Sequence, residues 1–121
     1  MKRDDAIYVE RIIEAIDQIF VFIGDADEDK FLRNRMMCDA CLMQLVVIGE
    51  NGGKVSQENK ERFSEVQWQL MKAARNFFAH AYEFTDWNRV WDTINTILPS
   101  LKVKLENILD ILEKERDAET N

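Results

Sequence analysis

The apolar residues of this chain recur every three or four positions along most of its 121 residues. Such spacing places side chains on one face of an α-helix, whereas a half-buried strand needs strict alternation. We find no alternating stretch, internal repeat or low-complexity linker. Only four glycines and one proline are present to interrupt the pattern. The sequence therefore predicts long helices joined by short connections.

Four helices are predicted, at about residues 5–23, 31–48, 56–82 and 87–112. Gly24 ends the first helix, and the run Gly-Glu-Asn-Gly-Gly at 49–53 ends the second. Pro99 lies inside the fourth pattern and should kink or break it, which would add a fifth short helix. Residues 115–121 lack apolar periodicity and are expected to fray. Short connections favour an all-α, antiparallel up-and-down four-helix bundle.

Length and composition indicate a globular domain and argue against a membrane protein. With 46% hydrophobic residues, residues 1–121 can bury the core of one helical domain. No apolar run approaches the roughly 18 residues of a membrane span, and the first residues lack the apolar segment of a signal peptide. We therefore expect a cytoplasmic protein that does not enter membranes.

The net charge of −7 argues against a broad nucleic-acid surface, and against DNA as a partner. Cations do gather locally before the histidine, at Lys54, Lys60, Arg62, Lys72 and Arg75. An anionic ligand such as RNA would have to be bound by this basic patch alone.

Residues 75–82 concentrate groups that can act on a phosphate ester. They include Arg75, Asn76, Tyr82 and the only histidine of the chain, His80. An arginine fork binds phosphate oxygens, and a histidine transfers protons near neutral pH. On its own His80 would be interpreted as a structural histidine. Beside Arg75 and Tyr82 it predicts a functional site.

The helix that carries these residues has two apolar stripes. The first, which includes Phe63, Val66 and Leu70, is wide enough to join the core. The second stripe consists of Trp68, Met71, Arg75, Phe78 and Tyr82. Its aromatic, Met and Arg content favours a dimer interface or a ligand cleft. The alternative is a core that wraps widely around a central helix.

His80 lies about 140° from Arg75 around an ideal helix, on the side of Asn76. The two groups therefore diverge within one straight helix. Either the helix distorts near His80, or a second chain completes the site. A two-fold dimer would supply two histidines and two arginines to one cleft, one group to accept a proton and another to donate one.

Cys38 and Cys41 form a C-x-x-C pair in the middle of the second predicted helix. A zinc site needs about four ligands, and there is neither a second cysteine pair nor a second histidine. We interpret both thiols as small core residues and predict no metal or cofactor site.

The pattern Arg75-Asn76-x-x-x-His80-x-Tyr82 resembles the Arg-x-x-x-x-His-x-Tyr motif of HEPN domains of the HepT-like type. The resemblance covers nearly the whole chain, to Leu112. It includes four further landmarks: Gly49-Glu50, Trp68, Val90-Trp91 and Leu98-Pro99. Ala81 stands where glycine is common in that family.

The resemblance implies a dimeric helical bundle and a metal-independent endoribonuclease that acts as a toxin, paired with a minimal nucleotidyltransferase antitoxin. By the same resemblance Arg75 would hold the scissile phosphate, His80 would be the acid–base group and Asn76 would orient the site. Tyr82 would be the site of modification with AMP.

The alternative function is a non-catalytic binding module, in which the same cleft docks a nucleotidyltransferase or a nucleotide and Tyr82 is the modification site. A third interpretation is a helical assembly protein without any site. A monomer with His80 in its own core would favour the third.

Overall fold

A computed structural model describes residues 4–72, 75 and 85–120 of the chain. All regular secondary structure in these residues is helical, which confirms the all-α prediction. The helices are α1 (Asp5–Ile23), α2 (Glu28–Arg33), α3 (Arg35–Lys54), α4 (Gln57–Arg62), α6 (Trp87–Thr96) and α7 (Leu98–Thr120). Residues 68–72 are helical as well.

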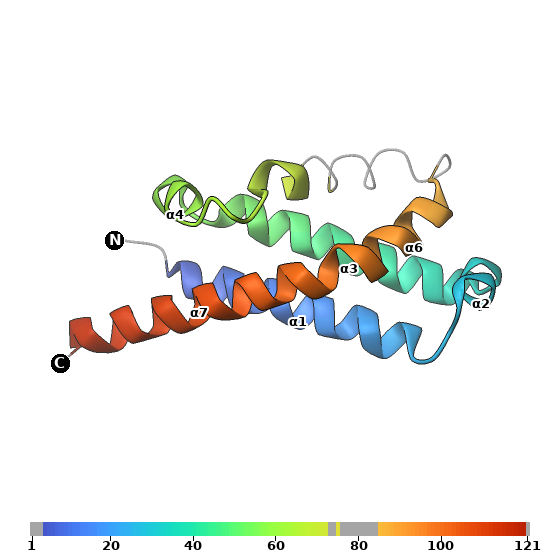
Figure 1. The fold of residues 1–121 in the computed structure, drawn as a ribbon, viewed down its shortest axis with the longest axis horizontal. Helices are drawn as coiled ribbons and strands as arrows, with labels where there is room; N and C mark the ends of the chain where they lie inside the picture. The colour runs from blue at the N-terminus through green and yellow to red at the C-terminus, as the bar shows by residue number, and fades with distance from the viewer. Residues whose placement is uncertain (1–3, 73–74, 76–84, 121) are drawn as a thin grey trace.

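The three longest helices build the body of the molecule. α1 packs against both α3 and α7, and it runs antiparallel to each of them (Figure 1). α2 and α6 pack together at one end, while the start of α1 and the end of α7 share the other. None of the described helices is long and apolar enough to cross a membrane.

The apolar stripe of α1 forms the centre of the core. Val9, Ile12, Ile16 and Ile19 are completely buried, at the spacing of three and four that the sequence shows. Each fully buried aliphatic side chain of this kind contributes about 1.5–3 kcal/mol of transfer free energy. Because α3 packs extensively against α1, this core fixes the position of α3.

Local capping signals set most helix boundaries where the sequence predicts them. Gly24 ends α1 with a φ of 56°, which favours glycine. The Asp27 side chain accepts a hydrogen bond from the Lys30 amide at the start of α2. Asp86 caps α6 in the same way. Asn34 divides the second predicted helix in two, because its side chain caps α3 through the Met37 amide.

The glycine-rich run at 49–53 does not end the second helix, contrary to the prediction. α3 continues through it to Lys54. Asn51 and Gly52 are buried there, so tertiary packing outweighs the weak helix propensity of glycine.

The C-terminal tail is a second correction, because α7 stays helical to Thr120 instead of fraying. Two ion pairs hold its last turns, Arg62–Glu115 and Arg116–Asp4. Pro99 does break the pattern: α6 ends at Thr96, and α7 begins at Leu98. The helix after the break is the longest of the described helices, at 23 residues, rather than a short one.

The third predicted helix, 56–82, is interrupted. α4 ends at Arg62, and regular helix resumes only at Trp68. The interruption rotates the faces that continuous periodicity predicted: Trp68 and Met71 are buried in the core of their own chain, whereas Leu70 is 60% exposed. The Trp68 indole N–H donates to the Phe63 carbonyl at 3.1 Å, across the break.

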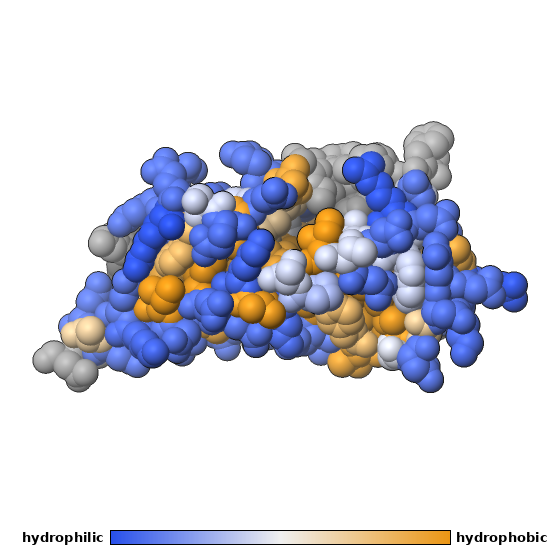
Figure 2. All heavy atoms as spheres, viewed as in Figure 1, coloured by the Kyte–Doolittle hydropathy of each residue, from blue (hydrophilic) through white to orange (hydrophobic). Residues whose placement is uncertain are grey.

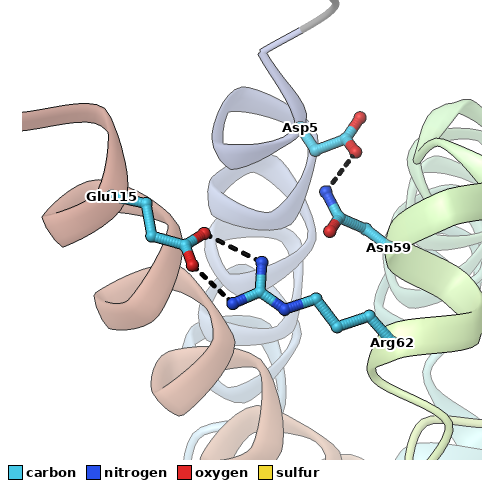
Figure 3. A network of polar contacts seen from close by, with 4 residues as sticks. All are labelled: Asp5, Asn59, Arg62 and Glu115. Atoms are coloured by element: carbon cyan, nitrogen blue, oxygen red, sulfur yellow. Dashed lines mark hydrogen bonds and ion pairs between the residues drawn. The ribbon is translucent and has the colours of Figure 1, made fainter. Parts of the chain in front are cut away.

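Short α4 is anchored at both ends (Figure 3). At its start, the buried Asp5 carboxylate accepts from the Ser56 hydroxyl at 2.6 Å and from the Asn59 amide at 2.7 Å. At its end, Arg62 donates two hydrogen bonds to Glu115 of α7, at 2.8 and 2.5 Å. α4 therefore ties the beginning of α1 to the end of α7.

Candidate functional site

Three of the predicted site residues lie in the described part of the chain. Arg75 is partly buried, and Trp68 and Met71 belong to the core. The other predicted site residues, Asn76, Phe78, His80 and Tyr82, lie outside the described residues, so their roles stay predictions. The burial of Trp68 and Met71 agrees with the alternative of a core that wraps widely around the helix, and the interface or cleft interpretation of their stripe stays a prediction.

Arg75 lies directly against the backbone of α3. A Cβ atom built on Gly49 would come within 2.3 Å of the Arg75 Cβ and 2.7 Å of the Met71 carbonyl oxygen. Real Cβ atoms do not approach other heavy atoms so closely, so only glycine allows this contact. A Cβ atom on Gly52, one turn further along α3, would lie 3.0 Å from Cε at the end of the Met71 side chain. The two glycines therefore allow Met71 and Arg75 to approach α3 closely.

The Arg75 guanidinium is only partly engaged. Its Nη1 lies 3.5 Å from Oε1 of Glu50, at the outer limit of a hydrogen bond. The two side chains are 33% and 49% exposed, so the pair adds little to stability. The Nε atom is buried, and none of the described residues accepts a hydrogen bond from it. The Nε–H group thus has donor capacity that the described chain leaves unused.

A cavity of about 440 Å³ begins one helical turn before Arg75, at Met71. Leu45 and Ile48 of α3 and Leu98 of α7 line its apolar part. Gln67, Arg89 and Lys104 are among the polar residues around it. The cavity is large enough for a small organic group, with apolar walls and few charges.

The basic patch is smaller than the sequence suggests. Arg62 is paired with Glu115, and this hydrogen-bonded contact lowers the pKa of the Glu115 carboxyl. Lys60 donates to the Gly53 carbonyl oxygen at 3.3 Å. On the face seen in Figure 2, hydrophilic side chains surround separate apolar patches. The cations that precede Arg75 therefore serve partly to hold the fold.

Cys38 and Cys41 are free and buried, which confirms that they are core thiols. Burial raises the pKa of the Cys38 thiol, and raises that of Cys41 to about 12. Both stay protonated and unreactive at neutral pH. Within the described ranges, no three His, Cys, Asp or Glu side chains come together as metal ligands.

From the sequence, Gly49 and Glu50 are interpreted as a helix end, with a polar group near the cleft as the alternative for Glu50, and the close approach of Gly49 to Arg75 is not predicted. The available signal was the spacing of Gly49 and Gly52, three residues apart. In a continuing helix that spacing clears one face for another backbone.

Comparison with known proteins identifies the family. The family model described as "Ribonuclease HepT-like" matches residues 12–108. "Probable ribonuclease HepT" of Thermococcus cleftensis is 32% identical over 108 residues, which cover 89% of this chain and 98% of that protein. "Putative RNase MJ1380" of Methanocaldococcus jannaschii is 29% identical over 105 residues, or 87% and 96%.

A longer protein of the same archaeon, "Gamma-glutamylcyclotransferase and putative RNase MJ0434", is 26% identical over 121 residues. This chain spans 54% of the length of that relative. No solved structure matches the chain significantly. The family match covers most of the chain, including Arg75 and the residues that hold it. The chain belongs to the HepT-like ribonuclease family.

Proposed function

We propose that this protein is a metal-independent endoribonuclease whose active site is shared by two copies of the chain. The observation that carries the proposal is the state of Arg75. It is held against α3, while its buried Nε finds no acceptor among the described residues. Membership of a ribonuclease family supports a phosphodiester as the ligand of the Arg75 guanidinium.

In the proposed reaction Arg75 binds the scissile phosphate and stabilises the charge that develops on it. The ribose 2′-oxygen attacks phosphorus, and the bond from phosphorus to the 5′-oxygen of the next nucleotide breaks. One group takes the proton of the 2′-hydroxyl, and another protonates the leaving oxygen. The products are a 2′,3′-cyclic phosphate and a free 5′-hydroxyl. His80 is the proposed acid–base group, and Asn76 orients the site.

The dimer follows from this proton balance. One histidine cannot take and give a proton in the same step, and the sequence holds one per chain. In the proposed dimer Phe78 lies near the shared cleft. Exposed Leu70 and Ile97, which line the cavity beside Met71, add apolar surface for the contact. Isologous pairing would bring both motifs to one two-fold axis.

We further propose that the protein is the toxin of a toxin–antitoxin pair, with a minimal nucleotidyltransferase as antitoxin. Transfer of AMP to Tyr82 would put a bulky anion into an RNA cleft and block it by size and charge. A gain in mass on Tyr82, when partner and ATP are supplied, is the expected sign of this modification.

The test is cleavage of single-stranded RNA by the purified protein in excess EDTA. We expect 2′,3′-cyclic phosphate ends, and a loss of at least about 100-fold in rate for His80→Ala, because general acid–base groups contribute this much. The melting temperature of the variant should stay close to that of the wild type. Robust cleavage by His80→Ala, or a strict need for added metal, would contradict the proposal.

A further inference from the structure

We infer that Glu50 is a positioning residue for Arg75, and that Gly49 and Glu50 of α3 together hold its guanidinium in place to bind the RNA phosphate. This inference rests on the proposed function, because it assigns the residues that hold the arginine in that reaction. It gives two residues of α3 a role in the site beside the groups predicted at residues 75–82.

The backbone of α3 at Gly49 fixes where the Arg75 side chain begins. Gly49 brings the Arg75 Cβ to a distance at which any side chain at position 49 would collide with it. The starting point of the arginine side chain is therefore fixed against α3. Because α3 is packed along α1 in the centre of the molecule, this starting point is a rigid one. Rigid support of this kind is what a phosphate-binding group needs.

Glu50 contacts one corner of the Arg75 guanidinium. A guanidinium donates through Nε, Nη1 and Nη2. Oε1 of Glu50 lies 3.5 Å from Nη1. Nε is buried and has no acceptor among the residues that the structure describes. Glu50 therefore approaches the group at Nη1, from α3, and restrains its orientation.

The contact between Arg75 and Glu50 contributes little to the stability of the fold. Both side chains are partly exposed and the contact is long, so the ion pair holds little folding free energy. Its effect is on direction, since it restrains a side chain that otherwise rotates about several bonds. Removal of the carboxylate should therefore change catalysis while the fold stays intact.

The experiment compares Glu50→Ala and Glu50→Gln with wild type in single-stranded RNA cleavage. Asp110→Ala is the matched control, because Asp110 is an exposed carboxylate paired with Lys114 on α7. We expect Glu50→Ala to lower kcat about tenfold, in line with a misplaced binding group, and to change KM by less than about threefold. Glu50→Gln keeps an oxygen acceptor for Nη1 and should restore kcat to within about threefold of wild type.

The outcomes separate the inference from the proposed function. If wild type cleaves RNA and Glu50→Ala cleaves equally fast, the inference is wrong and the function stands. If Glu50→Gln is as slow as Glu50→Ala, the carboxylate acts through its charge and the positioning role is overturned. A change in melting temperature as large as the change in rate would likewise indicate a structural role and overturn it.

If wild type does not cleave RNA, the proposed function fails, and the contact is tested without activity. The Nε–H resonance of Arg75, assigned with Arg75→Lys, reports the surroundings of the guanidinium. We expect it to shift in Glu50→Ala and to stay in place in Asp110→Ala. An unchanged resonance in Glu50→Ala would show that Glu50 does not position Arg75.

Discussion

Gly49 and Gly53 lie four residues apart on α3, yet an added methyl group would meet different surroundings at each. At Gly49 it collides with Arg75 and the Met71 carbonyl, whereas at Gly53 nothing lies within 4 Å. We predict that Gly49→Ala lowers the free energy of unfolding by about 1–3 kcal/mol, the usual cost of overpacking. Gly53→Ala should raise it by about 0.4–1 kcal/mol, because alanine restricts the unfolded chain.

Urea denaturation of the two variants measures this difference. The same pair tests whether Arg75 depends on α3, since Gly49→Ala should also lose RNA cleavage while Gly53→Ala keeps it. Equal stability of the two variants would mean that the close contact between α3 and Arg75 is absent in solution.

Single residues show where sequence reasoning succeeds and where it stops. The burial of Cys38 and Cys41 could be predicted, because a mid-helix position among apolar neighbours is a local property. The role of Asp5 could not. Its partners Ser56 and Asn59 are 51 and 54 residues away, and only the tertiary fold brings them together.

At the level of elements, α4 has six residues, too few to be stable as an isolated helix. The hydrogen bonds to buried Asp5 should therefore hold it in place. We predict that Asp5→Ala lowers the free energy of unfolding by about 1–3 kcal/mol, because it leaves the partly buried donors of Ser56 and Asn59 without their acceptor. Glu10 is an exposed carboxylate that lies on α1, as Asp5 does. The variant Glu10→Ala should therefore change the free energy of unfolding little.

Chemical denaturation gives the two values, and hydrogen exchange of the α4 amides locates the effect. Faster exchange confined to α4 in Asp5→Ala would support its anchoring role. If Glu10→Ala and Asp5→Ala were equally stable, the Asp5 hydrogen bonds would make no net contribution to the free energy of unfolding.

Helix boundaries followed the sequence where the signal was local and departed from it where packing decided. Gly24, Asp27 and Asp86 act through their own backbone and neighbouring amides, so their roles could be predicted. The run at 49–53 remains helical because Gly49 and Gly52 face Met71 and Arg75 across a tertiary contact. Likewise, periodicity alone could not reveal the interruption between Arg62 and Trp68.

For the whole molecule, the proposed shared active site predicts a dimer whose stability depends on concentration. Since association stabilises only the folded state, we expect the melting temperature to rise as protein concentration increases. Light scattering should give twice the mass of the 14.3 kDa chain. A monomer at all concentrations, with undiminished RNA cleavage, would contradict the composite site.

The candidate site combines residues that local sequence patterns indicate with contacts that depend on the fold. The chemistry proposed for Arg75 and His80 is predicted from residue type and spacing, and so is the divergence of the two side chains around a helix. The support that α3 gives to Arg75 comes from a contact 25 residues away in sequence, which no local pattern encodes. Sequence therefore predicts which groups would react, whereas the contacts of Arg75 with Gly49 and Glu50 come only from the fold.

The ion pair between Arg116 and Asp4, at 2.9 Å, has a consequence for rearranging the chain. It joins residues 112 positions apart, so the start of α1 and the last turns of α7 are spatial neighbours. A short flexible linker could close the chain into a ring, and new ends could be opened in the turn at residues 24–26. Such a circular permutant would keep α3, Glu50 and Arg75 within one uninterrupted segment, and would move the chain ends to the opposite end of the molecule.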